Sequence, residues 1–167
     1  MKTFKEYIQT TTPIVIKKPE QCSEYELILF HQMVMKGLQT KITMAGLEEK
    51  AEYLGFYYDG TELAAVGAIK KPLAAKFVFQ EAGVPDKASH YKFEIGWSFV
   101  EPKYRSQGVN QKLSKALLEE VHNVPVFCTI RSENSASVAA FQKLGFQVIG
   151  DPFYWNSGAL IMLFVKG

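Results

Sequence analysis

Cysteine is scarce in this sequence, whose 167 residues include only Cys22 and Cys128. The two lie far apart, and neither belongs to a group with metal-ligand spacing. We therefore expect two buried thiols, and predict neither a disulfide framework nor a metal site. Long apolar runs are missing too. No segment approaches the roughly 18 apolar residues of a membrane-spanning helix, and the first residues lack the apolar core of a signal peptide. These absences predict a cytoplasmic protein with no membrane partner.

An excess of charge of either sign is also absent. The 19 Lys and Arg residues against 17 Asp and Glu residues leave a formal net charge of +2. So small a balance gives no electrostatic reason to expect nucleic acid as a partner. Hydrophobic residues make up 47% of the chain and charged residues 22%, which is ordinary globular composition. The length predicts a single domain over residues 1–167.

The chain has no internal repeat and alternates between strand and helix patterns. Ser23 and Glu26 form a capping box at the start of the first helix, and Asp59-Gly60 is a strong hairpin signal. Strand-like runs occur at residues 14–16, 54–58, 62–70, 91–100, 126–130, 146–149 and 159–165, and helix-like runs follow Ser23 and occupy 47–54, 73–82, 108–122 and 134–144.

This order of elements predicts an α+β (mixed α/β) fold, in which a mixed sheet is flanked by helices. The strand over 91–100, the helix over 108–122 and the strand over 126–130 form a βαβ unit. Its two strands should therefore be parallel, with a right-handed crossover between them. Gly96 lies inside the first of these strands, where a glycine is typical of a bulge or a close backbone approach.

The segment most informative about function is residues 100–113, VEPKYRSQGVNQKL. Here a strand ends, a polar turn follows, and a helix begins at Gly108. The first amides of a helix have no internal partners, and the helix dipole adds positive potential, so a phosphate group suits this position. Gly108 allows the backbone to approach an anion closely. A plain polar turn is the alternative, because neither a GxGxxG fingerprint nor a Walker P-loop is present.

Residues 94–120, EIGWSFVEPKYRSQGVNQKLSKALLEE, resemble the acyl-CoA binding motif of the GNAT superfamily of N-acetyltransferases. Arg105-Ser-Gln-Gly-Val-Asn110 occupies the family's Arg/Gln-x-x-Gly-x-Gly/Ala signature. Further on, IRSENSASVAAFQKLGF resembles the second family hallmark, with Asn134 and Lys143-Leu-Gly-Phe146 in the characteristic places. With the earlier hairpin that contains Gly67, the resemblance covers the chain from about residue 54 to residue 150.

The resemblance implies a GNAT-like acyl-CoA N-acyltransferase fold, with a mostly antiparallel sheet of about six or seven strands and a splayed parallel pair at its centre. It also implies a site for acetyl-CoA as co-substrate, without a metal. The pantetheine arm would pair with the strand backbone as an added strand does, and the pyrophosphate would lie on the turn amides. The residues implied in binding are Ser98, Phe99, Val100, Arg105, Ser106, Gln107, Gly108, Val109, Asn110, Gln111, Asn134 and Phe141.

The expected reaction is attack of an amine on the acetyl thioester. An amine with a lysine-like pKa of about 10.4 is mostly protonated at neutral pH and must lose a proton. The resemblance implies Glu94 as the base, because it stands where the histone-acetyltransferase branch has its catalytic glutamate. It also implies the amide of Ser98 as a donor to the developing oxyanion. Side chains alternate along a strand, so Glu94 faces away from Phe93 and Ile95. A solvent-facing or ion-paired glutamate is the alternative.

Three positions depart from the family pattern. Asn110 replaces the usual Gly or Ala, and Phe141 stands where many members carry a tyrosine that protonates the departing thiolate. Thr129 replaces a glutamate of the ribosomal-protein N-terminal acetyltransferase branch, which argues against that branch.

Two functions follow from this sequence. The first is an N-acetyltransferase that moves an acetyl group from acetyl-CoA to a primary amine, on a small molecule or a protein. The alternative is an acyl-CoA-binding sensor or interaction module with little or no transferase activity. The resemblance also allows a homodimer.

Overall fold

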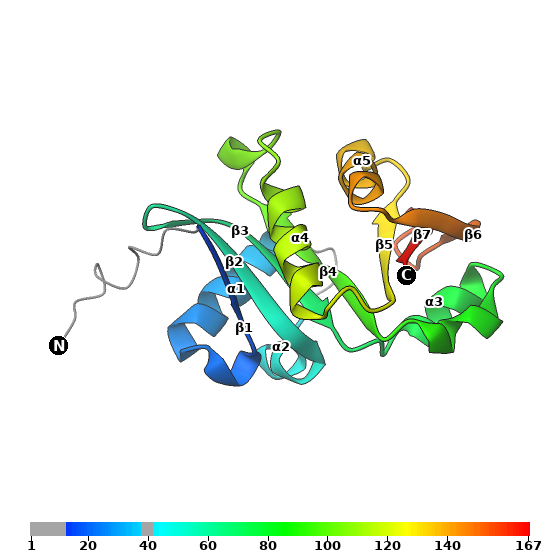
Figure 1. Cartoon of the computed structure of the whole chain (residues 1–167), viewed down its shortest axis with the longest axis horizontal. Helices are drawn as coiled ribbons and strands as arrows, with labels where there is room; N and C mark the ends of the chain where they lie inside the picture. The colour runs from blue at the N-terminus through cyan, green and yellow to red at the C-terminus, as the bar shows by residue number, and fades with distance from the viewer. Residues whose placement is uncertain (1–12, 38–41) are drawn as a thin grey trace.

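The computed structural model describes residues 13–37 and 42–167. Within these ranges the chain forms seven strands, five α-helices and three short 3-10 helices (Figure 1). None of the described helices is long and apolar enough to cross a bilayer. In chain order the elements are β1 (Ile14–Lys17), η2 (Pro19–Gln21), α1 (Glu24–Gly37), α2 (Met44–Lys50), β2 (Ala51–Asp59), β3 (Glu62–Lys70), α3 (Ala75–Glu81), η3 (Pro85–His90), β4 (Phe93–Val100), η4 (Pro102–Tyr104), α4 (Val109–Glu120), β5 (Val126–Arg131), α5 (Ser135–Lys143), β6 (Gln147–Tyr154) and β7 (Leu160–Lys166).

The described strands form one sheet in the order β1-β2-β3-β4-β5-β7-β6. Every neighbouring pair is antiparallel except β4 and β5, which are joined through α4 and run parallel. The β2–β3 hairpin predicted at Asp59-Gly60 is present, with Asp59 paired to Glu62 and Gly60 and Thr61 in the turn. These pairings confirm the predicted α+β class, the mostly antiparallel sheet and the parallel central pair.

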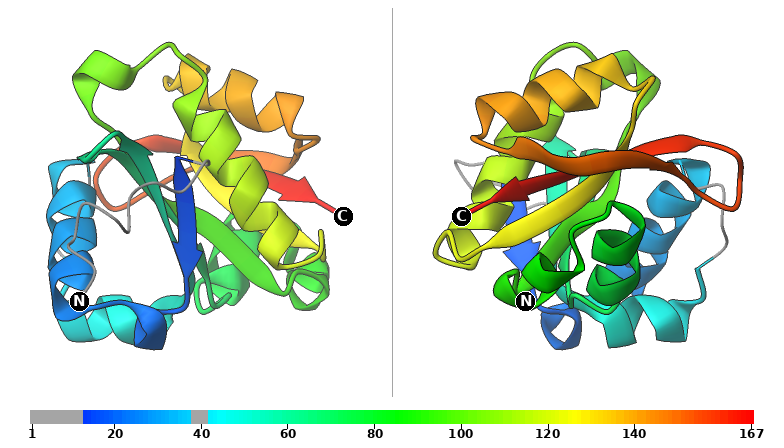
Figure 2. Two further views of the ribbon diagram at one scale, coloured as in Figure 1. Left: turned by 60° about the vertical axis from the view of Figure 1, so that its left-hand side comes forward. Right: turned by 90° about the vertical axis from the view of Figure 1, so that its right-hand side faces the viewer.

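Helices cover both faces of the sheet (Figure 2). On one face, α4 and α5 share an apolar cluster with Ile95 of β4. On the opposite face, α1 packs on β2, where the rings of Phe30 and Phe56 meet edge-on at 5.6 Å. On that same face α3 packs on β5, where Phe79 meets Phe127 edge-on at 5.3 Å. The second face therefore carries two separate apolar clusters, one on each side of β4.

Two helix predictions have different outcomes. The capping box is confirmed: the Ser23 amide donates to Glu26 Oε2 at 2.8 Å, and the Glu26 amide donates to Ser23 Oγ at 3.2 Å. The second helix exists, but its predicted bounds of 47–54 are wrong, because α2 covers Met44–Lys50 and residues 51–54 begin β2. Leu54 is fully buried opposite Ala68 of β3, so sheet pairing overrides the local helical preference there.

The parallel pair is splayed. Only Phe93 and Glu94 pair with β5, and beyond them the two strands separate toward the turn before α4 (Figure 1). On the β3 side, Val66 pairs with Phe99 and Ala68 pairs with Gly96, so Trp97 and Ser98 together oppose one residue. This is the two-against-one geometry of a β-bulge.

The predicted bulge therefore exists, but its predicted location at Gly96 is wrong. Gly96 pairs regularly with Ala68, and the residue in the left-handed region is Trp97, with φ +51°. Gly67 is the single residue opposite the bulge. A Cβ there would lie 3.3 Å from Leu117 of α4 and 3.6 Å from Ser98 Oγ. The missing side chain thus lets α4 and the bulge pack closely against β3.

We expect Gly150→Ala to lower the free energy of unfolding by at least about 2 kcal/mol, combining left-handed strain with a steric clash. Gly150 has φ +67°. A Cβ on it would lie 2.2 Å from the Ala82 carbonyl oxygen, which accepts a hydrogen bond from the Asp151 amide at 2.9 Å. That bond ties the end of α3 to β6.

Gly158→Ala is the matched control for this prediction. Gly158 has φ +80°, but nothing lies within 4 Å of the place that a Cβ would take, so only the conformational cost of about 1–2 kcal/mol applies. Urea unfolding of both variants measures the difference. Equal losses of unfolding free energy in the two variants would show that the steric clash with the Ala82 carbonyl makes no contribution.

Candidate active site

Two cavities lie on either side of the β4 bulge. The first, which we call the amide cleft, has a volume of about 780 Å³ and lies between the end of β4, the turn before α4, the start of α5 and the end of α1. The second, the Glu94 cavity, has a volume of about 820 Å³ and lies between the end of α2, β4, β5 and the β6–β7 turn. Ser98 lines the amide cleft and its neighbour Trp97 lines the Glu94 cavity. The bulge therefore separates the two cavities by a single strand.

The turn before α4 presents a row of free backbone amides to the amide cleft. Ser106 and Gly108 have φ values of +62° and +73°. The first amide of this region with a backbone acceptor is that of Lys112, which donates to the Gly108 carbonyl at 3.0 Å; over the described ranges, none of the amides of Ser106–Gln111 has one. Nothing lies within 4 Å of a Cβ placed on Gly108. Unpaired amides at a helix start, in a left-handed turn, form an anion-binding concavity.

Arg105 adds a fixed positive charge at the edge of the cleft. Its Nε donates to the Val100 carbonyl at 3.0 Å, and its guanidinium lies 5.6 Å from the centre of the Phe99 ring. Lys103 instead pairs with Glu62 at 2.7 Å. The Gln107 side chain donates to the Lys103 carbonyl at 3.0 Å and is not among the described residues that line the cleft.

Among the described residues, no strand pairs with the β5-facing edge of β4 beyond Glu94. The Glu101 amide donates to the Ala64 carbonyl of β3 at 2.9 Å, so the preceding Val100 carbonyl points the other way, toward the cleft. Arg105 is its partner there. Ser98, Phe99 and Val100 all line the cleft, so an extended ligand could add to this edge.

Asn134 and Asn110 both line the amide cleft, and each has a structural hydrogen bond. The Asn134 Oδ1 accepts from the Ser137 amide at 3.1 Å and caps α5. The Asn110 Oδ1 accepts from Ser114 Oγ at 3.4 Å, along α4. Each side chain therefore keeps its amide NH₂ group for a ligand.

Phe141 has a different position from the other predicted binding residues. It is 5% exposed and meets Phe146 edge-on at 5.1 Å, in the cluster shared by α4 and α5. It is not among the described residues that line either cavity.

Sequence reasoning missed the end of α1. Lys36 and Gly37 line the amide cleft, and Lys36 forms an ion pair with Glu101, just after β4. A Cβ on Gly37 would lie 2.7 Å from Phe99 Cδ2, so the missing side chain lets the helix end approach β4. The sequence shows Gly37 only as a helix stop, and nothing local indicates that this stop meets residues more than 60 positions away.

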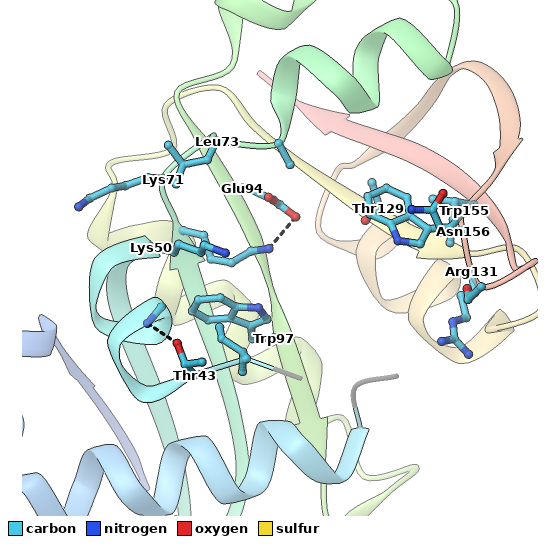
Figure 3. Close-up of a pocket in the computed structure, with 16 residues that line it drawn as sticks. Thr43, Lys50, Lys71, Leu73, Glu94, Trp97, Thr129, Arg131, Trp155 and Asn156 are labelled. Carbon is cyan, nitrogen blue, oxygen red and sulfur yellow. Dashed lines mark hydrogen bonds and ion pairs between the residues drawn. The ribbon is translucent and has the colours of Figure 1, made fainter. Parts of the chain in front are cut away.

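Glu94 is 8% exposed and faces the Glu94 cavity, opposite to Ile95, as strand alternation predicts. Its Oε1 accepts from Lys70 Nζ at 2.7 Å, and that ammonium group lies 5.2 Å from the centre of the Trp97 ring. Thr129, Trp155 and Asn156 form the opposite wall (Figure 3). Glu94 thus has an ion-pair partner and also borders a cavity, and within the described ranges only its Oε1 has a hydrogen-bond partner.

Neither cysteine suits a covalent mechanism. Burial raises the pKa of the Cys22 thiol to about 11 and raises the pKa of the fully buried Cys128 thiol well above its ordinary value. Thiolate, not thiol, is the nucleophile, so both groups are poorly reactive near neutral pH.

The fold is that of the acyl-CoA N-acyltransferases. An acyl-CoA N-acyltransferase from Pseudomonas aeruginosa matches with a TM-score of 0.68 at 13% identity, over 92% of this chain and 98% of that one. Escherichia coli ElaA matches with a TM-score of 0.67 at 16% identity, over 92% and 98%. The structure of YncA from Salmonella typhimurium with its cofactor acetyl-CoA matches with a TM-score of 0.60 at 15% identity, over 93% and 94%.

Residues 20–161 match the acetyltransferase (GNAT) domain family, and the chain belongs to that family. Among individual proteins, it is 30% identical over 71 residues to the N-alpha-acetyltransferase RimI of Mycobacterium tuberculosis, which is 41% of this chain and 45% of that protein. A Mycobacterium leprae protein, ML0378, is also 30% identical over 71 residues, which is 20% of its length. The chain thus matches less than half the length of these two relatives.

Proposed function

We propose that this protein is an N-acetyltransferase that moves an acetyl group from acetyl-CoA to a primary amine by direct attack on the thioester, with one domain over residues 1–167. The observation that carries this proposal is the position of the two cavities. The row of free amides lies on one side of the β4 bulge, and the buried Glu94 carboxylate lies on the other. An acetyl donor bound in the amide cleft and an acceptor amine bound in the Glu94 cavity would meet at Trp97 and Ser98.

The donor set of the amide cleft fits a CoA molecule. The free amides of Ser106–Gln111 suit its pyrophosphate, with Arg105 adding positive charge. The open edge of β4 suits the pantetheine arm, whose two amides can pair with strand backbone. The NH₂ group of Asn134 is a further donor. When bound, acetyl-CoA supplies an acetyl thioester as the electrophile.

On the other side of the bulge, Glu94 takes a proton from the acceptor amine. The amine nitrogen forms the new bond to the acetyl carbon, the carbon–sulfur bond breaks, and the thiolate leaves with CoA. The Ser98 amide donates to the negative charge that develops on the carbonyl oxygen.

Release of the CoA thiol tests this function. We expect that purified protein releases thiol from acetyl-CoA faster when a suitable primary amine is added, and that mass spectrometry finds the acetylated amine. If the protein binds CoA but no amine in a broad panel accelerates release, the binding-module alternative is correct. A thermal shift reports the binding separately, since ligand at 100 times its Kd stabilises by about 2.7 kcal/mol.

A further inference from the structure

The Glu94 cavity has an uneven charge. Among the described residues that line it, four are basic (Lys50, Lys70, Lys71 and Arg131) and one, Glu94, is acidic. This differs from the chain as a whole, where basic and acidic residues nearly balance. The excess of cations is therefore a local property of this cavity.

Two of these cations have other partners. Lys70 Nζ is 2.7 Å from Glu94 Oε1, which neutralises that pair. Lys71 Nζ donates to the Glu49 carbonyl at 2.8 Å, and its side chain points away from the cavity (Figure 3). Neither cation is therefore available to bind a negatively charged group of an acceptor molecule in the cavity.

Lys50 and Arg131 are the remaining pair. They lie on opposite walls, Lys50 at the end of α2 and Arg131 at the end of β5, and the Arg131 guanidinium points away from Glu94 (Figure 3). In the part of the chain that the structure describes, no carboxylate lies within 4 Å of either group. Arg131 follows Thr129 by two positions in β5, so both project from the cavity face of the sheet.

From this arrangement, and resting on the proposed function, we infer that the acceptor is a small-molecule amine with an anionic group, a carboxylate or a phosphate, at the end remote from the reacting nitrogen. Arg131 binds that anion and Lys50 adds positive charge from the opposite wall, while the amine lies at Glu94. The volume of about 820 Å³ suits a small molecule. Arginine binds carboxylate and phosphate in a fixed bidentate geometry, and lysine adds a mobile point charge.

The same charges disfavour other acceptors. A polyamine or a lysine-rich peptide would bring further positive charge against Lys50 and Arg131. The apolar part of the wall, Leu73, Trp97 and Trp155, suits a short aliphatic linker between the amine and the anion.

The test compares acceptors that differ in the charge at the end remote from the amine, and the carboxylates and their amides also match in shape. The anionic set is β-alanine, 4-aminobutyrate, 6-aminohexanoate and O-phosphoethanolamine; the neutral set is the matching amino amides and ethanolamine; the cationic probe is 1,4-diaminobutane. We expect kcat/KM for the best anionic acceptor to exceed that of its neutral match by at least about tenfold. Comparing kcat/KM for O-phosphoethanolamine with kcat/KM for the three amino acids shows whether phosphate or carboxylate is preferred.

Lys50→Gln and Arg131→Gln should each raise KM for the anionic acceptor about tenfold, leave kcat within about threefold, and leave the neutral acceptors unchanged. Lys115→Gln, a change of an exposed charge on α4 at a residue that is not among the described residues lining either cavity, is the control. Faster transfer to neutral or cationic amines, or to an acidic peptide alone, would overturn the inference and leave the proposed function standing.

A second measurement needs no turnover. Calorimetry of the N-acetylated anionic products should show binding to the wild type that both Gln variants weaken about tenfold. No binding to the wild type, or equal binding to all variants, would overturn the inference even if the protein transfers no acetyl group. If the protein binds CoA but releases no thiol with any amine, the proposed function is wrong, and the calorimetry still tests the inference separately.

Discussion

Gly108→Asp should weaken CoA binding by at least about 100-fold. Gly108 lies within the row of free amides, and its position has open space into which a side chain would project. A carboxylate about 5 Å from one phosphate charge costs about 3 kcal/mol at an effective dielectric of about 20, and the CoA pyrophosphate carries more than one charge. Isothermal titration with CoA measures the loss.

Gly108→Asn is the matched control, because Asn and Asp have nearly the same shape and both tolerate the left-handed region better than other residues. Gly108 has φ +73°, so the two variants share the conformational cost. We expect the Asn variant to bind CoA within about tenfold of the wild type. If both variants bind equally well, or equally badly, negative charge at this position does not matter and the pyrophosphate lies elsewhere.

The second large effect is expected for Glu94→Gln, which should lower kcat by about 100-fold or more while the Kd for CoA stays within about twofold. Removing a general base typically costs about 10²- to 10⁴-fold in rate. Glutamine keeps the shape of glutamate and can still accept from Lys70, but it cannot take a proton from the amine. The rate of thiol release at saturating acetyl-CoA and saturating amine measures kcat.

The ion pair with Lys70 provides the control for a purely structural role. Glu94→Gln leaves the Lys70 ammonium without its counter-charge and should lower the melting temperature. Lys70→Gln breaks the same pair but keeps the carboxylate, so we expect it to lose less than about tenfold in kcat. The double variant should regain stability without regaining kcat. Recovery of activity in the double variant would show that Glu94 serves only as a partner of Lys70.

Much of the fold and of the amide cleft could be predicted because the signals are local. Asp59-Gly60 sets a hairpin, Ser23 and Glu26 cap a helix, and a polar turn with Gly108 precedes a helix. Each depends on residues within a few positions of one another, and the structure confirms the elements they predict. The roles assigned to Glu94 and to the cleft residues stay predictions that the experiments above test.

The remaining features depend on residues far apart in the chain. Lys70 meets Glu94 because β3 and β4 pair in one register, and the bulge at Trp97 then shifts the register beyond it. A one-residue slip would turn every later side chain to the other face, and no local pattern encodes that choice. The same holds for Lys50 and Arg131, which come from α2 and β5, two elements far apart in the chain.

The row of free amides between residues 106 and 111 is tested most directly by nitrogen-15 NMR titration of the labelled protein. Addition of CoA should shift the amide proton signals of Ser106–Gln111 strongly, because each amide gains a charged acceptor. Pantetheine, which lacks the pyrophosphate, should leave those signals in place while shifting residues along β4. If CoA binds and shifts other amides but not these, this row of amides does not hold the pyrophosphate and the proposed donor site is wrong.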